Sequence, residues 1–188
     1  QERVKMDRKI VNLGCGMKPM EGATNVDLYS DLADVNADAL EYLDGCMDNS
    51  ISALHADHFV EHLTFEEEKR FFLELRRCLA IGGTAHIKVP DFEWLCRAFI
   101  SAEENSYKFY TKGKDSEYFG GGYDSTKRWS FLMATFYGHQ DGGGQFHYNG
   151  YTKKKLIGIA ELLDMQIDIS TYKRKSTVCL RATFTKNN

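Results

Sequence analysis

The sequence has little net charge, no long apolar run and no regular cysteine pattern. Its 188 residues contain 24 Lys and Arg against 27 Asp and Glu, which gives a formal net charge of −3 at pH 7. This near balance provides no strong attraction to a polyanion, so we expect neither nucleic acid nor a membrane surface as a partner. No apolar run approaches the roughly 18 residues of a membrane-spanning helix, and no signal-peptide pattern opens the sequence.

The five cysteines are odd in number and irregularly spaced, and no two of them form a C-x-x-C pair. Such usage is typical of reduced thiols, so we expect a cytoplasmic protein. The length is sufficient for one well-packed domain, and we expect residues 1–188 to form a single unit. The sequence leaves the oligomeric state open.

Short apolar stretches alternate with helical patterns over the first hundred residues. We expect strands at 9–14, 23–30, 51–57 and 84–91. Thr64 and Glu67 form a capping-box pattern that predicts the start of a helix, and Gly82-Gly83 predicts its end. A second helix is expected after Asp91. Alternation of this kind predicts a parallel sheet with helices packed on it.

The last part of the chain departs from this alternation. Residues 165–171 and 176–184 read as two strands joined by a turn, so we expect them to be antiparallel, with the final strand inside the sheet. Residues 101–150 are rich in glycine and aromatic side chains, and we expect them to form a cap that binds a substrate. The alternative is a packing segment that only covers the sheet.

The stretch "IVNLGCG" (10–16) reads as a strand that enters a glycine turn. A dinucleotide site needs G-x-G-x-x-G at the start of a helix, and an acidic residue about 20 positions later. Here Pro19 replaces the third glycine, and Asp27 follows Gly14 by 13 residues. A nucleoside ligand without a pyrophosphate fits this pattern better than NAD, and S-adenosylmethionine (SAM) is such a ligand.

With these residues the chain resembles the class I (Rossmann-like) SAM-dependent methyltransferases, and among them the predicted small-molecule methyltransferases. Six segments across most of the chain carry the resemblance: "VNLGCG" (11–16), "NVDL" (25–28), "NADAL" (36–40), "HADHFVEHL" (55–63), "LRRCLAIGGTAHIKVPD" (75–91) and "YNGYTKKKLIGIAELLDM" (148–165). The chain departs from the family in having no clear first helix after the glycine turn.

The resemblance implies both a fold and an activity. The fold is an α/β Rossmann-like methyltransferase sheet, mostly parallel and seven-stranded with an antiparallel last strand, with helices on both faces and the aromatic-rich insert as a cap. The activity is transfer of a methyl group from SAM to an oxygen or nitrogen atom of a small-molecule acceptor, which leaves S-adenosylhomocysteine.

The resemblance also implies which residues bind SAM. The glycine turn would lie against the methionine moiety, the acidic residue after the second strand would bind both ribose hydroxyls, and the next residue would pack on the adenine. A later acidic residue and its neighbour would contact the adenine amino group, and two residues after the third strand would lie near the sulfonium. The residues of the glycine turn are Gly14, Cys15 and Gly16, and those after the second strand are Asp27 and Leu28. The later pair is Asp38 and Ala39, and the two residues near the sulfonium are Asp57 and His58.

Two of these acidic residues have simpler alternatives. Asp27 could be an exposed carboxylate at a strand end, and Asp38 could cap a loop or helix.

Four histidines are candidates for a general base, which methyl transfer needs only when the acceptor must lose a proton. They are His58, His62, His139 and His147. The segment "HFVEH" (58–62) also matches the H-x-x-E-H pattern of inverted zinc proteases. That chemistry needs both histidines on a helix, whereas this segment lies in a short loop or single turn, so we expect no metal ligands here. Glu61 is expected to be structural.

Three classes of function therefore follow from the sequence. The first is the methyltransferase. The second is a SAM-binding sensor or partner subunit without catalysis, which would lack an acceptor-sized cavity near the sulfonium. The third, the least favoured, is a zinc-dependent hydrolase.

Overall fold

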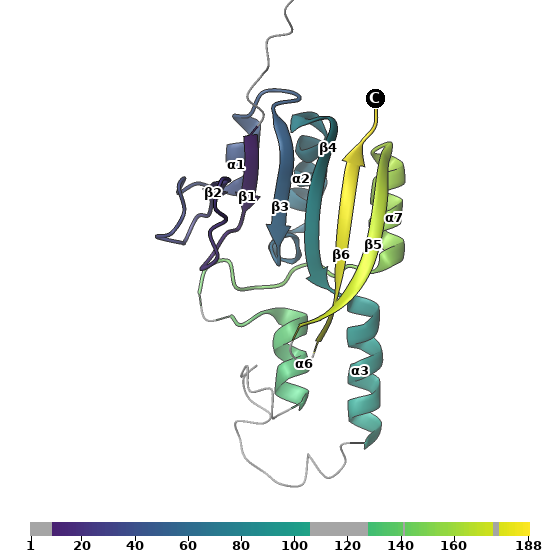
Figure 1. The fold of residues 1–188 in the computed structure, drawn as a ribbon. Coiled ribbons are helices and arrows are strands. Elements are labelled where there is room, and N and C mark those ends of the chain that lie inside the picture. The colour runs from purple at the N-terminus through teal and green to yellow at the C-terminus, as the bar shows by residue number, and fades with distance from the viewer. Residues whose placement is uncertain (1–8, 106–127, 141, 175–176) are drawn as a thin grey trace, which may run out of the picture.

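A computed structural model describes residues 9–105, 128–140, 142–174 and 177–188, and shows a mixed α/β arrangement around one sheet (Figure 1). Six strands form the sheet in the described part of the chain, in the order β2-β1-β3-β4-β6-β5. In chain order the strands are β1 (Lys9–Leu13), β2 (Thr24–Val26), β3 (Ile51–Asp57), β4 (Leu79–Pro90), β5 (Met165–Arg174) and β6 (Thr177–Lys186). The helices are α1 (Ala39–Asp44), a 3-10 turn η1 (Val60–His62), α2 (Phe65–Cys78), α3 (Phe92–Asn105), α6 (Arg128–Tyr137) and α7 (Lys153–Leu162).

The strand directions agree with the pattern of the sequence. β1 pairs in parallel with β2 and β3, and β3 pairs in parallel with β4. β6 lies antiparallel between β4 and β5, which confirms the antiparallel pair and the final strand inside the sheet. The described residues supply six strands where the resemblance implies seven. After β2 the chain makes only an isolated bridge between Val26 and Val35, because the Asp34 carboxylate accepts from the Asn25 amide in place of a backbone carbonyl.

Helices cover one face of the sheet among the residues described, whereas helices were expected on both. In Figure 1, α1, α2 and α7 lie behind the sheet. The core lies between these layers, where Leu54 and Ala85 of the sheet lie in one cluster with Phe71 of α2. The other face of the same strands carries polar side chains, including the stacked rings of His55 and His86. Polar side chains gain little from burial, which is the physical reason why that face needs no helix.

The start of α2 follows its sequence pattern, and its end does not. The Thr64 side chain accepts a hydrogen bond from the Glu67 amide, and the Glu67 carboxylate accepts one from the Thr64 amide, so the predicted capping box is present. The helix ends at Cys78, before Gly82-Gly83, and both glycines lie within β4. Leu79 is fully buried beside Ile51 in the sheet, so burial of this apolar side chain in a strand sets the end of the helix.

The aromatic segment after residue 100 contributes a second, smaller core. α6 packs on α3 below the sheet in the view of Figure 1, with Leu95, Ala98 and Leu132 buried between them. The ring of Phe136 meets those of Phe92 and Phe99 edge-on. Residues 106–127 of the predicted cap lie outside the described residues.

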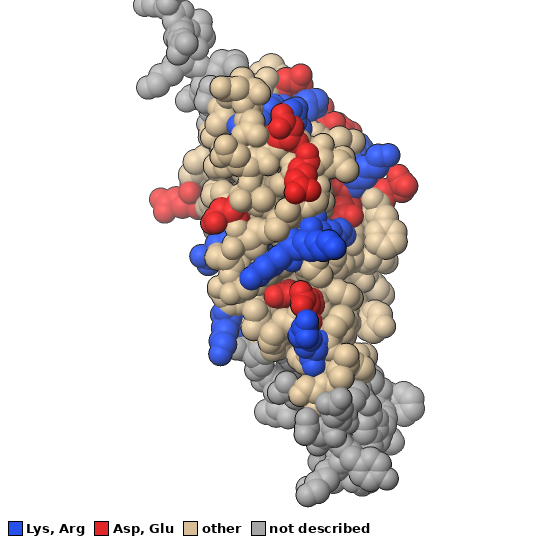
Figure 2. Space-filling view, turned by 90° about the vertical axis from the view of Figure 1, so that its right-hand side faces the viewer, with Lys and Arg blue, Asp and Glu red and all other residues tan. Residues whose placement is uncertain are grey.

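Charges of both signs are mixed on the surface. On the face drawn in Figure 2, Lys and Arg alternate with Asp and Glu, as the balanced composition predicts. None of the described helices is both long enough and apolar enough to cross a membrane.

Candidate functional site

A cavity of about 580 Å³ opens at the carboxyl ends of β1, β3 and β4. Ligands of open parallel sheets bind at this edge, because the loops that follow the strands converge there. The glycine turn (14–20) forms one wall, and the turn after β3 forms another. The third wall comes from α6 and the segment that follows it.

The glycine turn is shaped by positive backbone angles and by a close side chain. Gly14 has φ +63°, and a Cβ atom there would lie 2.6 Å from the ring of Phe59. Gly16 has φ +51°, but a Cβ atom there would have nothing within 4 Å. The amide of Gly14 donates to the Val26 carbonyl at 2.9 Å. No helix follows the turn before Ala39, in agreement with the missing first helix.

Asp27 holds the glycine turn against the end of β2. Its Oδ2 atom accepts a hydrogen bond from the Gly16 amide at 2.8 Å. Its Oδ1 atom accepts from the amides of Tyr29 at 2.8 Å and Ser30 at 2.9 Å. Asp27 and Leu28 lie outside the cavity lining, and Leu28 is 49% exposed. The end of β2 therefore presents a half-buried carboxylate beside an uncovered apolar side chain.

Asp38 caps a helix. Its Oδ1 atom accepts hydrogen bonds from the amides of Leu40 at 2.8 Å and Glu41 at 3.2 Å, and Ala39 is the buried first residue of α1. Asp38 and Ala39 also lie outside the cavity lining.

The turn after β3 contains a buried ion pair. His58 adopts φ +56°, and its Nδ1 atom lies 3.0 Å from Oε1 of Glu61. Its Nε2 atom faces the Tyr172 hydroxyl at 3.3 Å. Burial alone would lower the pKa of His58, but its contacts with Cys179 and with the Glu61 carboxylate raise it to about 9.

Glu61 is almost completely buried, with 2% of its surface exposed. Burial alone would raise its pKa, but the hydrogen bond and the charge of His58 lower it, so the carboxylate is ionised. Asp57 is likewise ionised. Burial alone would raise the pKa of its carboxyl, but Lys88, whose Nζ atom lies 2.8 Å from Oδ2, lowers that pKa by more.

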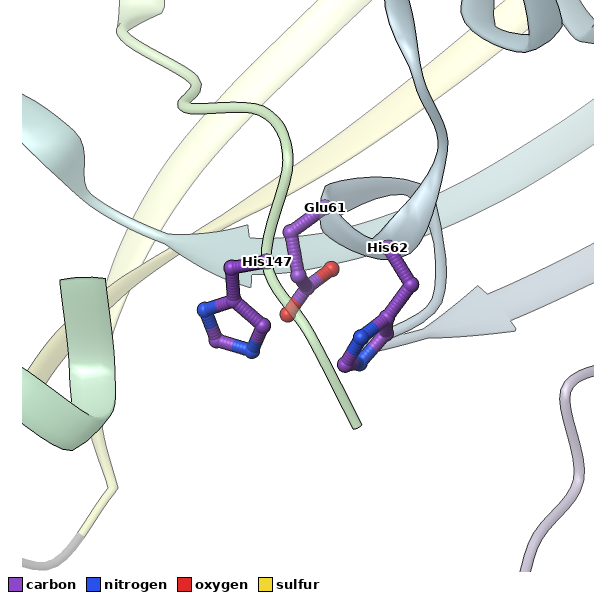
Figure 3. A group of neighbouring side chains, drawn as sticks. All are labelled: Glu61, His62 and His147. Carbon is purple, nitrogen blue, oxygen red and sulfur yellow. The ribbon is translucent and has the colours of Figure 1, made fainter. Parts of the chain in front are cut away.

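The segment after α6 brings His147 close to His62 of the turn η1 (Figure 3). His147 Nδ1 lies 2.9 Å from the Thr135 carbonyl, and His62 Nδ1 lies 2.9 Å from the Phe146 carbonyl. The two rings meet edge-on with centroids 4.7 Å apart. Burial is the main cause that lowers the pKa of His147.

Backbone hydrogen bonds hold this segment in place. The amides of Tyr148 and Asn149 donate to the Glu61 carbonyl at 2.9 and 3.2 Å. His139, which is exposed, also lines the cavity.

The sequence-predicted site residues therefore fall into two sets. The cavity is lined by Gly14, Cys15, Gly16, Asp57, His58, His62, His139 and His147. The residues assigned to the ribose and the adenine, Asp27, Leu28, Asp38 and Ala39, lie outside its lining.

Several solved structures with a similar fold are SAM-dependent methyltransferases. A SAM-dependent methyltransferase from Archaeoglobus fulgidus is 14% identical, over 95% of this chain and 86% of its own, with a TM-score of 0.61. A SAM-dependent methyltransferase from Methanosarcina mazei is 13% identical, over 98% of this chain and 94% of its own, with a TM-score of 0.57. The chain has the Rossmann-like fold of class I SAM-dependent methyltransferases.

A third structure with this methyltransferase fold contains ligands. It is the 1,6-didemethyltoxoflavin-N1-methyltransferase of Burkholderia thailandensis, with 1,6-didemethyltoxoflavin and S-adenosylhomocysteine bound. It is 13% identical, over 96% of this chain and 72% of its own, with a TM-score of 0.57. Neither a family model nor a curated protein sequence matches the chain.

One cluster of side chains in this cavity is not predicted by the sequence pattern. Glu61, His62 and His147 each offer one ligand atom, and these atoms lie within 4.8 Å of one another. The H-x-x-E-H pattern pointed instead to His58 and His62, and His58 is not part of the group. No local signal could have joined His147 to His62, because the two residues are far apart in the sequence.

Proposed function

We propose that the protein is a methyltransferase that moves the methyl group of SAM to an oxygen or nitrogen atom of a small-molecule acceptor. One observation carries the proposal: in a methyltransferase fold, a single cavity joins the glycine turn after β1 to a group of histidines after β3 and α6. The Burkholderia structure, which contains both S-adenosylhomocysteine and 1,6-didemethyltoxoflavin, supports the choice of ligands.

The residues around the glycine turn fit SAM. Gly16 leaves open space where any side chain would stand, so a ligand has access to the backbone there. We assign Gly14, Cys15 and Gly16 to the methionine moiety, and Asp57 and His58 to the surroundings of the sulfonium. The carboxylate of Asp27 fixes the Gly16 amide and lies at the edge from which ribose hydroxyls would be bound.

The adenosine half would lie over the surface at the end of β2. Leu28 is 49% exposed there, and an adenine ring would cover its apolar surface. Asp38 and Ala39, at the start of α1, are the proposed neighbours of the adenine amino group. Asp38 would keep its role as helix cap while its remaining oxygen binds the ligand.

SAM supplies an electrophilic methyl group on a good leaving group. The protein contributes mainly alignment of the acceptor with that group and exclusion of water. Where the acceptor must lose a proton, a base has to reach it within the cavity, and His58, His62, His139 and His147 all line that space. His58 is the least suited, because both of its ring nitrogens face protein groups, Glu61 and Tyr172.

Residues 101–150 form the proposed acceptor cap of this single domain. His139, Gln145 and His147 come from this insert and line the cavity opposite the glycine turn. A cavity that extends from the turn to these side chains has room for an acceptor, which favours an enzyme over a SAM-binding sensor without catalysis.

Calorimetry with SAM, S-adenosylhomocysteine and NAD tests the first step. We expect the first two to bind and NAD not to bind; binding of NAD alone would overturn the proposal. Release of S-adenosylhomocysteine in the presence of small hydroxyl or amine compounds then tests turnover. Tight SAM binding without release of S-adenosylhomocysteine for any acceptor class would favour a SAM-binding sensor without catalysis.

A further inference from the structure

Three side chains of types that bind metal ions lie close together in the lining of the cavity. Glu61 and His62 come from the turn η1, and His147 comes from the segment after α6 that crosses it (Figure 3). One ligand atom from each lies within 4.8 Å of the other two. All three residues line the cavity, so a cation among them would face its interior.

The carboxylate of Glu61 has one oxygen without a partner. Oε1 is engaged by His58 at 3.0 Å. Oε2 is buried and has no hydrogen-bond partner among the described residues. An ionised oxygen in that position loses its hydration and gains nothing in return, so it is costly unless a cation or a donor satisfies it.

Both histidines are held as metal-binding histidines are held. A carbonyl oxygen only accepts hydrogen bonds, so the Nδ1 atoms of His62 and His147 must each carry a proton toward Phe146 and Thr135. In the neutral ring the lone pair is then on Nε2. Imidazoles that bind metal ions typically donate their other N–H to a backbone carbonyl or carboxylate, which fixes the ring for the metal.

We propose that Glu61, His62 and His147 bind one divalent transition-metal ion. Two imidazoles and one carboxylate suit Zn²⁺, Mn²⁺, Fe²⁺ or Co²⁺ better than Ca²⁺ or Mg²⁺, which prefer oxygen ligands. Bonds of about 2.0–2.2 Å require ligand atoms about 3–3.5 Å apart, so the three side chains would draw together when the ion binds. His58 is a positioning residue, since its contact with Oε1 turns Oε2 toward the ion.

The ion also indicates a class of acceptor, and this step rests on the proposed methyl transfer. Three protein ligands leave coordination positions open, and these face the cavity. An acceptor hydroxyl bound there becomes more acidic, because the cation stabilises the alkoxide or phenolate that attacks the methyl group. The hydroxyl proton passes to solvent water, the oxygen forms its bond to the methyl carbon as the carbon–sulfur bond breaks, and S-adenosylhomocysteine leaves. The proposed acceptor is therefore a hydroxyl compound, and His62 and His147 act as ligands instead of bases.

Untagged protein stripped of metal with a chelator tests the site. Calorimetric titration with Zn²⁺, Mn²⁺ and Co²⁺, with the visible absorption of Co²⁺ as a second readout, is expected to give one tight ion per chain. His147→Ala should weaken that binding about tenfold to a hundredfold, and Glu61→Gln should weaken it to a similar extent. His139→Ala, which removes an exposed histidine of the same cavity, is the matched control and should bind like the wild type.

Three results would overturn the site: no stoichiometric ion on the stripped wild type, unchanged binding by His147→Ala, or equal loss in His139→Ala. Circular dichroism shows whether each variant is folded, and His147→Ala decides the matter if Glu61→Gln does not fold. These titrations need no SAM, so they test the metal site independently of the proposed function.

A chelator tests the acceptor class. It should abolish methylation of hydroxyl compounds while SAM affinity is unchanged. Methylation that persists in the chelator would overturn the hydroxyl assignment.

Discussion

The Oδ2 atom of Asp27 lies 2.8 Å from the amide nitrogen of Gly16 and fastens the glycine turn to the end of β2. Two further backbone amides donate to the other oxygen of this carboxylate. Asp27 thus fixes the protein backbone beside the proposed ribose site. Its replacement should act on ligand affinity and on the local backbone together.

Asp27→Asn keeps one acceptor oxygen and removes the charge. We expect SAM to bind about tenfold to a hundredfold more weakly, because a hydrogen bond to a charged group contributes about 1.5–3 kcal/mol. Calorimetry measures the affinity, and urea unfolding measures the accompanying loss of stability. Asp31→Asn, at an exposed neighbour in the same loop, is the control. An unchanged dissociation constant would remove Asp27 from the SAM site.

Alanine substitutions at the two glycines should separate stability from binding. Gly14→Ala combines a left-handed backbone with a clash against Phe59, and should lower the free energy of unfolding by about 2–4 kcal/mol. Gly16→Ala has the same backbone strain without a clash, and should cost about 1 kcal/mol. Its added methyl group should nevertheless weaken SAM binding. Equal losses of stability in urea unfolding would contradict the packing of Phe59 on the turn.

Replacement of His139 and His147 by Ala should spare SAM affinity and reduce turnover. Both residues line the cavity on the side proposed for the acceptor, and loss of acceptor alignment costs about a hundredfold in rate. The readout is release of S-adenosylhomocysteine with the true acceptor, beside calorimetry with SAM. If the double variant works at the normal rate, the insert is packing only, and the acceptor must be sought along residues 55–63.

The thiol of Cys78 should resist alkylation in the folded protein. It is fully buried, and burial is the main cause that raises its pKa to about 12. The reactive form is the thiolate, and its population rises with pH, so at about pH 8.5, where a free thiol is half ionised, Cys78 stays protonated. Mass spectrometry after iodoacetamide treatment checks this, with all five cysteines reacting in urea as the control. Rapid labelling of Cys78 in the folded protein would contradict its burial.

Local features of this fold were accessible from the sequence. The capping box of Thr64 and Glu67 depends on residues three positions apart, and it is present. The strand at the glycine turn and the antiparallel final pair were likewise predicted from short apolar patterns. The end of α2 was not, because burial of Leu79 in the sheet outweighs the turn signal of Gly82-Gly83.

What the sequence by itself determined is therefore the strand at the glycine turn, the start of α2 and the antiparallel final pair, since these follow from neighbours along the chain. What the tertiary structure decided is which side chains meet. The Asp27 carboxylate accepts from the Gly16 amide, eleven positions away. His147 lies beside His62 because the Tyr148 and Asn149 amides pair with the Glu61 carbonyl. Such contacts join distant segments, and they form only when burial and backbone pairing across the whole fold compensate the loss of chain entropy.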